Sequence, residues 1–178
     1  QYPIYCRKKE TLAAAEEVLL DVNSLAAGQS YCSVSEVQAS PQGDLLVYAI
    51  DLMGRRKYTL QFRDLKSGAM LPDQITDVTG NLVWAEDNQT VFYTRQDPET
   101  LRSYQVFRHQ IGTDSAHDVL VYEELDEEFA CGVGKTKSNK FVFIASVQTL
   151  STEIRLIDAG QPSSEPKVFE PRRRDHEY

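Results

Sequence analysis

The chain has 178 residues, 41% of them hydrophobic and 26% charged, which is the balance of a soluble globular domain long enough to bury a core. Its formal net charge of -8 would repel a phosphate backbone, so nucleic acid is not expected as a partner. The longest apolar stretch, at residues 141–147, is far too short to span a bilayer, and no membrane partner is expected either.

The N-terminal segment gives two conflicting signals. Residues 10–26 are rich in strong helix formers, and propensity alone predicts a helix there. The repeat in the rest of the chain instead favours outer strands of a preceding unit at residues 2–8 and 17–21. We expect these strands, followed by a short helical turn over residues 23–27.

From residue 37 onward the chain alternates between strands and turns. A turn signal, Pro-Gln-Gly-Asp at residues 41–44, separates strands at 37–40 and 45–50, and residues 57–65 alternate as a further strand. The pattern recurs with strands at 81–85, 90–94, 104–109 and 118–122, and again at 141–145, 153–158 and 167–169.

The second strands of the three copies, centred on Val47, Val91 and Val142, lie roughly 45 to 50 residues apart. Four-stranded units at this spacing are typical of propeller blades. The sequence therefore predicts an all-β fold, a partial β-propeller of about three complete four-stranded antiparallel blades plus part of a preceding one. Propellers need about four to eight blades to close, and the chain does not begin with Met, so we expect both ends to lie inside a longer protein.

Motifs for chemistry are sparse. The sequence has no Gly-x-Ser-x-Gly nucleophile motif, and its histidines have no metal-ligand spacing, so no metal and no cofactor are expected. For His109 and His117 we expect surface or hydrogen-bonding roles. Residues 132–136, Gly-Val-Gly-Lys-Thr, are not a phosphate-binding loop, because the first glycine of such a loop is missing and a strand follows instead of a helix.

The three cysteines, Cys6, Cys32 and Cys131, form no Cys-x-x-Cys pair and are odd in number. This pattern favours free thiols in a reducing compartment over a disulfide framework. We therefore expect a cytoplasmic location.

Three charged stretches are candidate contact surfaces. Residues 123–128, Glu-Glu-Leu-Asp-Glu-Glu, predict either a solvated loop or an acidic surface that attracts basic peptides. Arg55 and Arg56 lie at a hairpin tip, where they are either solvated or face a peptide carboxylate. The third stretch consists of the arginines at 172–174, which could form ion pairs with neighbouring acidic side chains just as easily as they could serve as a contact surface.

Several segments, taken in order, also carry a family resemblance. They are Tyr-Pro-Ile-Tyr-Cys-Arg-Lys at 2–8, Leu-Leu-Asp-Val-Asn at 19–23, Gly-Arg-Arg-Lys-Tyr at 54–58, Leu-Gln-Phe-Arg-Asp-Leu at 60–65, Tyr-Gln-Val-Phe-Arg-His at 104–109, Ile-Gly-Thr at 111–113, Val-Tyr-Glu-Glu at 121–124 and Pro-Arg-Arg-Arg-Asp-His-Glu-Tyr at 171–178. Over essentially the whole chain, this ordered set resembles the oligopeptidase B branch of the prolyl oligopeptidase family of serine peptidases.

The resemblance implies a seven-bladed propeller that caps an α/β-hydrolase domain. Residues 1–35 would be outer strands of blade one, 36–79 blade two, 80–128 blade three, 129–171 blade four and 172–178 the start of blade five. Members of this branch are hydrolases that cleave short peptides after Arg or Lys, and their propeller restricts access to the nucleophile. Their Ser, Asp and His belong to the hydrolase domain, which this chain lacks.

On this basis we expect a substrate-gating propeller segment of a serine endopeptidase that is inactive by itself. Its expected partners are short basic peptides and the missing hydrolase domain. Arg56, together with Arg55, is the expected substrate contact, and no residue of this chain is expected to be catalytic.

Two alternatives stay open. One is a non-enzymatic protein-binding propeller, although WD dipeptides and kelch double glycines do not occur here. The other is the prolyl oligopeptidase branch, which cleaves after Pro. In every case an open array leaves unpaired sheet edges, so we expect the isolated chain either to self-associate through them, for example as a dimer, or to be marginally soluble.

Overall fold

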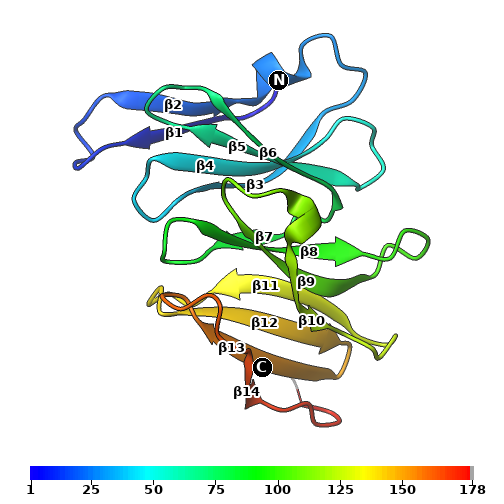
Figure 1. The fold of residues 1–178 in the computed structure, drawn as a ribbon. Coiled ribbons are helices and arrows are strands. Elements are labelled where there is room, and N and C mark those ends of the chain that lie inside the picture. The colour runs from blue at the N-terminus through cyan, green and yellow to red at the C-terminus, as the bar shows by residue number, and fades with distance from the viewer. Residues whose placement is uncertain (177–178) are drawn as a thin grey trace.

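The structure, a computed structural model that describes residues 1–176, consists of four antiparallel sheets stacked in chain order (Figure 1). The first has two strands and the other three have four each, with spatial neighbours also consecutive in sequence. The elements are β1 (Ile4–Lys8), β2 (Glu16–Asp21), α1 (Val22–Ala26), β3 (Ser33–Ala39), β4 (Leu45–Asp51), β5 (Tyr58–Asp64), β6 (Met70–Val78), β7 (Leu82–Trp84), β8 (Thr90–Gln96), β9 (Ser103–Gln110), the 3₁₀ turn η1 (Ser115–His117), β10 (Val119–Glu123), β11 (Ala130–Lys135), β12 (Phe141–Gln148), β13 (Ser151–Asp158) and β14 (Lys167–Glu170). The predicted all-β architecture of four-stranded antiparallel units is confirmed.

The N-terminal segment forms strands despite its helix propensity. β2 pairs with β1 and buries Leu19 and Leu20 in a cluster with Tyr48 of β4. Tertiary packing of this kind overrides a preference worth at most tenths of a kcal/mol per residue. The short helix α1 then begins after Asp21, whose carboxylate accepts a hydrogen bond from the Asn23 N–H at 2.9 Å.

The hairpins that join the first and second strands share one backbone feature. Each contains a residue in the left-handed region at the equivalent position: Gly43 (φ 70°), Asn88 (φ 61°) and Asn139 (φ 59°). Glycine and asparagine are the residues that enter this region most readily. The glycine or asparagine in each of these turns therefore helps to determine where the second strand begins.

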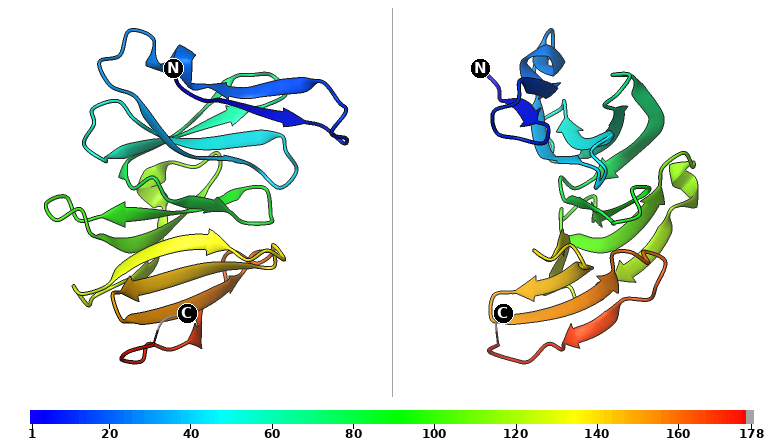
Figure 2. Two further views of the ribbon diagram at one scale, coloured as in Figure 1. Left: turned by 180° about the vertical axis from the view of Figure 1, so that it is seen from behind. Right: turned by 90° about the vertical axis from the view of Figure 1, so that its left-hand side faces the viewer.

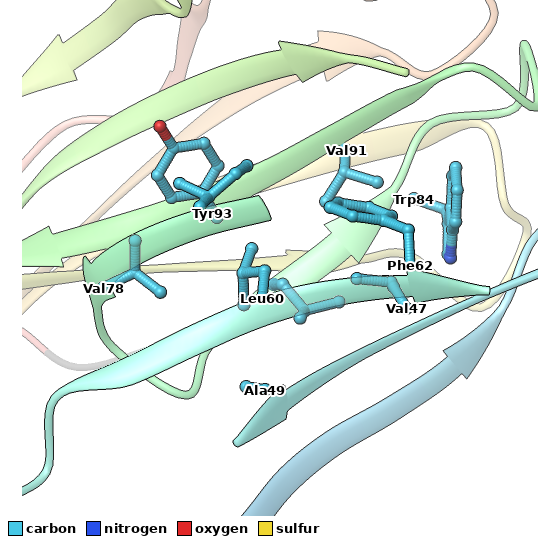
Figure 3. Close-up of a cluster of buried hydrophobic side chains, with 10 residues drawn as sticks. Val47, Ala49, Leu60, Phe62, Val78, Trp84, Val91 and Tyr93 are labelled. Atoms are coloured by element: carbon cyan, nitrogen blue, oxygen red, sulfur yellow. The ribbon is translucent and has the colours of Figure 1, made fainter. Parts of the chain in front are cut away.

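The second strands β4 and β8 are buried on both faces because each lies between two neighbouring sheets. In β4, Val47 and Ala49 pack toward the third sheet, while Leu46 and Tyr48 pack toward the first. These alternate positions point to opposite faces of a strand. Figure 3 shows one such interface, in which Phe62 meets Trp84 edge-on with ring centroids 6.3 Å apart.

The last sheet has one apolar face without a neighbouring sheet among the described residues. Val142 and Ile144 of β12 are buried against the third sheet. The opposite face bears Phe141, Phe143 and Val147, and it lines a hollow of about 1080 Å³ together with residues of β13 and β14. Figure 2 shows this sheet at the end of the stack opposite to β1 and β2.

A buried histidine joins the second and third sheets at their outer strands. His109 of β9 is fully buried, with Nδ1 2.7 Å from Asp118 Oδ1 and Nε2 3.1 Å from Asp73 Oδ1 on β6. Asp118 also accepts the Tyr93 hydroxyl at 2.8 Å, and the Phe62 ring lies 5.6 Å from the imidazole. Both ring nitrogens donate to carboxylates only when the imidazole is protonated. Burial lowers the pKa of His109, but Asp118 and Asp73 outweigh this effect, so the pKa lies above its usual value.

This arrangement predicts a pH-dependent stability. The native state holds the His109 proton more tightly than the unfolded chain does. The contribution of His109 to the free energy of unfolding is therefore complete below about pH 6.5, and it declines as the pH rises through the raised native pKa. His109→Gln should lower the unfolding free energy by about 3 kcal/mol at pH 6, since two buried carboxylates lose the cation that pairs with them, and should flatten this part of the pH profile. Guanidinium unfolding at a series of pH values measures both effects. The exposed His117→Gln serves as the control, and an unchanged profile in His109→Gln would refute the assignment.

Candidate functional site

The connections between strands divide between two sides of the stack. Hairpins between second and third strands, at residues 52–57, 97–102 and 149–150, all lie on the right-hand side of Figure 1. The crossovers between consecutive sheets, at residues 79–81 and 124–129, lie on the same side, because each follows a strand that runs toward it. This side therefore carries both the hairpins between second and third strands and the crossovers between consecutive sheets.

Arg55 and Arg56 occupy the first of these hairpins. The carboxylate of Asp51, itself buried, accepts hydrogen bonds from the N–H groups of Met53, Gly54 and Arg56 at 2.8–2.9 Å. Arg56 adopts a left-handed conformation (φ 55°), and its carbonyl accepts a hydrogen bond from Gln96 at 2.7 Å. The backbone of the tip is thus held in place while both arginine side chains remain exposed. The substrate contact that the sequence suggested for Arg55 and Arg56 stays a prediction.

A polar cleft of about 600 Å³ lies beside this hairpin. It runs between the first strands of the sheets, and Gln96, which anchors the Arg56 carbonyl, lines it. Most of its lining side chains carry hydroxyl or amide groups. The lining residues are Ser35, Glu36, Tyr58, Thr79, Gly80, Asn81, Thr94, Gln96, Ser103, Cys131, Gly132, Val133, Phe143 and Ala145. Of these, only Glu36 carries a full charge at neutral pH.

Side chains bridge the first strands of neighbouring sheets. The Asn81 amide accepts from the Val133 N–H at 2.7 Å and donates to the Val133 carbonyl at 2.9 Å. Between the preceding pair of sheets, Trp84 Nε1 donates to the Gln38 carbonyl at 3.2 Å. Gly80 permits a close approach here, since a Cβ at this position would lie 2.7 Å from the Ser35 Cβ. These bonds, which we call inter-sheet bridges, fix the spacing of the first strands.

A buried ionic network fills the crossover between the third and fourth sheets. Arg172 donates to Glu124 at 2.7 Å and to Glu153 at 3.3 Å, and its guanidinium lies 4.1 Å from the centroid of the Phe129 ring. Burial would raise the pKa of Glu124, but hydrogen bonds from Arg172 and Tyr122 lower it to about 2. The acidic run at 123–128 is therefore not a uniformly solvated loop, because Glu124 is only 3% exposed. Glu124 therefore has a structural role, the other acidic side chains of the run are exposed, and an acidic surface that attracts basic peptides stays a prediction. The ion pairing expected for the 172–174 arginines is observed at Arg172.

The described residues offer little reactive chemistry. No His, Cys, Asp or Glu side chains within residues 1–176 gather in a group of three or more that could hold a metal ion. All three cysteines are free thiols, and burial raises the pKa of Cys131 to about 12, which leaves it unreactive. Across this same part of the chain, no helix has both the length and the apolar character needed to cross a membrane.

Glu36 is the site residue that sequence reasoning missed. It sits at a bulge of β3, where the pairing with β4 shifts between Ser35 and Val37. The sequence does contain a sign of this bulge. Val34 and Val37 both pack on the apolar cluster between the first and second sheets, yet they lie three residues apart. A strand alternates with a period of two, so this spacing requires one extra residue between them. Terminal residues 177 and 178, expected to open blade five, lie outside the described part of the chain.

Comparisons with known proteins agree on one relationship. Residues 1–178 match the family model of the prolyl oligopeptidase N-terminal β-propeller domain. The chain is 42% identical to dipeptidyl aminopeptidase BI of Pseudoxanthomonas mexicana, covering 99% of this chain and 26% of that protein, and 35% identical to protease 2 of Moraxella lacunata, covering 97% and 26%. It superposes on the structure of oligopeptidase B from Leishmania major with a TM-score of 0.87 and 30% identity, covering 97% of this chain and 25% of that one. The chain thus spans about a quarter of the length of these relatives, and the predicted partial β-propeller is confirmed.

Proposed function

The chain belongs to the prolyl oligopeptidase family of serine peptidases, within the N-terminal β-propeller domain, and from this membership we propose that it is the substrate-gating part of a longer endopeptidase that hydrolyses short peptides after Arg or Lys. The observation that carries the proposal is the combined likeness, at 30% identity and a TM-score of 0.87 over nearly the whole chain, to an oligopeptidase B. The four sheets would be the last part of blade one and blades two to four of a seven-bladed ring, with the boundaries predicted from the sequence.

The inter-sheet bridges support a gating role. They tie the first strand of each sheet to the next through the Asn81 amide and the Trp84 indole. First strands held at fixed spacing form a wall that does not part to admit a folded protein. A short, flexible peptide needs no such opening, so the filter would act through size and flexibility.

The side that carries the crossovers and the hairpins between second and third strands is the proposed contact surface for the hydrolase domain. Exposed apolar side chains stand at the tips of these connections: Met53 is 67% exposed, Leu125 81% and Leu150 51%. Three such tips lie on this side, compared with Leu12 in the β1–β2 hairpin on the opposite side, and such clustering is typical of a surface that another domain covers. A domain docked there would also place its nucleophile near the polar cleft and the Arg55–Arg56 hairpin.

A hydrolysis assay tests the proposed activity. The full-length protein should release chromophore from a short, N-terminally blocked peptide with Arg or Lys before the scissile bond, and should leave a folded protein with exposed arginines intact. Residues 1–178 alone should give no turnover, because they contain no nucleophile motif. Turnover by the isolated chain above a buffer blank would contradict the proposal.

Two further substrates separate the neighbouring specificities. A dipeptidyl substrate with a free amino end tests the activity named in the 42% identical relative, and a blocked peptide with Pro before the scissile bond tests the prolyl branch. Preference for either over the blocked Arg peptide would replace the proposed specificity while leaving the family unchanged.

The hairpin arginines generate a second prediction. In the full-length protein, Arg56→Gln and Arg55→Gln should each raise KM for a short peptide with a free carboxyl end by roughly two- to fivefold, with kcat unchanged, because an exposed cation contributes modestly to ground-state binding. The effect should shrink in high salt and vanish for a peptide amide. Lys137→Gln, in a hairpin of the opposite side, is the matched control. Equal effects on the peptide acid and the peptide amide would exclude a carboxylate contact.

We also propose that the apolar face of the fourth sheet is covered by the next blade in the full-length protein and by a second copy in the isolated chain. The face is lined by Phe141, Phe143, Val147, Ile154 and Leu156. Light scattering of residues 1–178 should therefore show a concentration-dependent dimer, and Phe143→Ser should shift it toward monomer. A monodisperse monomer of the unaltered chain at high concentration would refute the idea.

A further inference from the structure

Glu36 occupies a position that packing does not explain. It is the extra residue of the β3 bulge, with a left-handed backbone (φ 41°), and its side chain is exposed. Residues with a Cβ disfavour this conformation, whereas glycine accepts it freely. A bulge on a strand re-aims a side chain, and here the bulged residue lines the polar cleft.

The charge of Glu36 is not neutralised by a cation within the described part of the chain. Its carboxylate accepts one hydrogen bond, from the Gln38 amide at 3.0 Å, and no salt bridge to it is formed. No other lining residue of the 600 Å³ cleft carries a charge at neutral pH. A single negative charge at the wall of a concave site concentrates the field there and attracts cations.

The surroundings fit a small cationic group. Thr79 and Ser103 contribute hydroxyl groups to the cleft and Gln96 contributes an amide, whereas the Thr94 hydroxyl is buried against that of Thr79. Such groups accept hydrogen bonds from an ammonium or guanidinium that a carboxylate has attracted. The same Gln96 anchors the hairpin that carries Arg55 and Arg56, so the negative and positive groups lie on one continuous surface.

We propose that Glu36 and the cleft form a subsite for a positively charged group of a peptide, either a Lys or Arg side chain or the α-ammonium of its N-terminus. A peptide bound there would direct its carboxyl end toward Arg55 and Arg56. The inference rests on the proposed peptidase function and names, for this chain, the residue that selects cationic peptides before cleavage.

The test compares Glu36→Gln with Glu10→Gln in the full-length protein. Glu10 is a matched control, because it is also exposed and left-handed (φ 64°) but lies in the β1–β2 hairpin, outside the cleft. The substrates are blocked peptides with Arg at the scissile bond that differ only in a distant Lys or norleucine. Glu36→Gln should lower kcat/KM for the Lys peptide by roughly fivefold and leave the norleucine peptide unchanged, while Glu10→Gln changes neither. Equal effects on the two peptides, or no effect, would overturn the subsite.

A third variant and a binding measurement keep the result interpretable. Glu36→Gly removes the charge and relaxes the backbone, so it should retain or raise the melting temperature while losing the same preference for the Lys peptide.

Free and acetylated N-termini on the norleucine peptide distinguish an α-ammonium from a side chain as the ligand. Fluorescence anisotropy of the labelled peptides separates the two hypotheses. If the peptides bind in a Glu36-dependent way but are not hydrolysed, the peptidase function is refuted and the subsite is retained. If they are hydrolysed without any dependence on Glu36, the subsite is refuted and the peptidase function is retained.

Discussion

The second strands of the second and third sheets, β4 and β8, are buried on both faces, and the rest of the structure depends on this double burial. β4 and β8 each contribute side chains to two different apolar clusters, one with the preceding sheet and one with the following sheet. No single sheet can therefore cover its own apolar surface, and each folds stably only against its neighbours. The inter-sheet bridges and the buried Arg172 network form at the junctions that this packing brings together.

The same constraint explains how much of the fold could be read from the sequence. Double burial produces short, continuous apolar runs such as 45–50 and 90–94, and these runs identified the repeat. The outermost strand β6 was missed because it contains Pro72 and buries few apolar side chains, mainly Ile75 and Val78. An edge strand of this composition gives almost no periodic signal.

The candidate site was harder to predict because its determinants are distant in sequence or lie in the backbone. Arg172 and Glu124 are 48 residues apart, and Asp73 and His109 are 36 apart, so no local pattern links either pair. Glu36 owes its direction to a bulge, which the spacing of Val34 and Val37 indicates only once strand pairing is known. By contrast, the hairpin of Arg55 and Arg56 was located correctly, because its turn is encoded locally by Asp51 and Gly54.

The Asn81 bridge has a consequence for how a peptide can be held inside such a ring. By occupying both the N–H and the carbonyl of Val133, the amide closes the edge of β11 at the point where an extended peptide would otherwise add as another strand. Main-chain capture is therefore blocked at this part of the wall. Under the proposed function, a peptide that passes this wall would be recognised by its side chains and termini, and it would move along the wall without breaking a ladder of backbone hydrogen bonds.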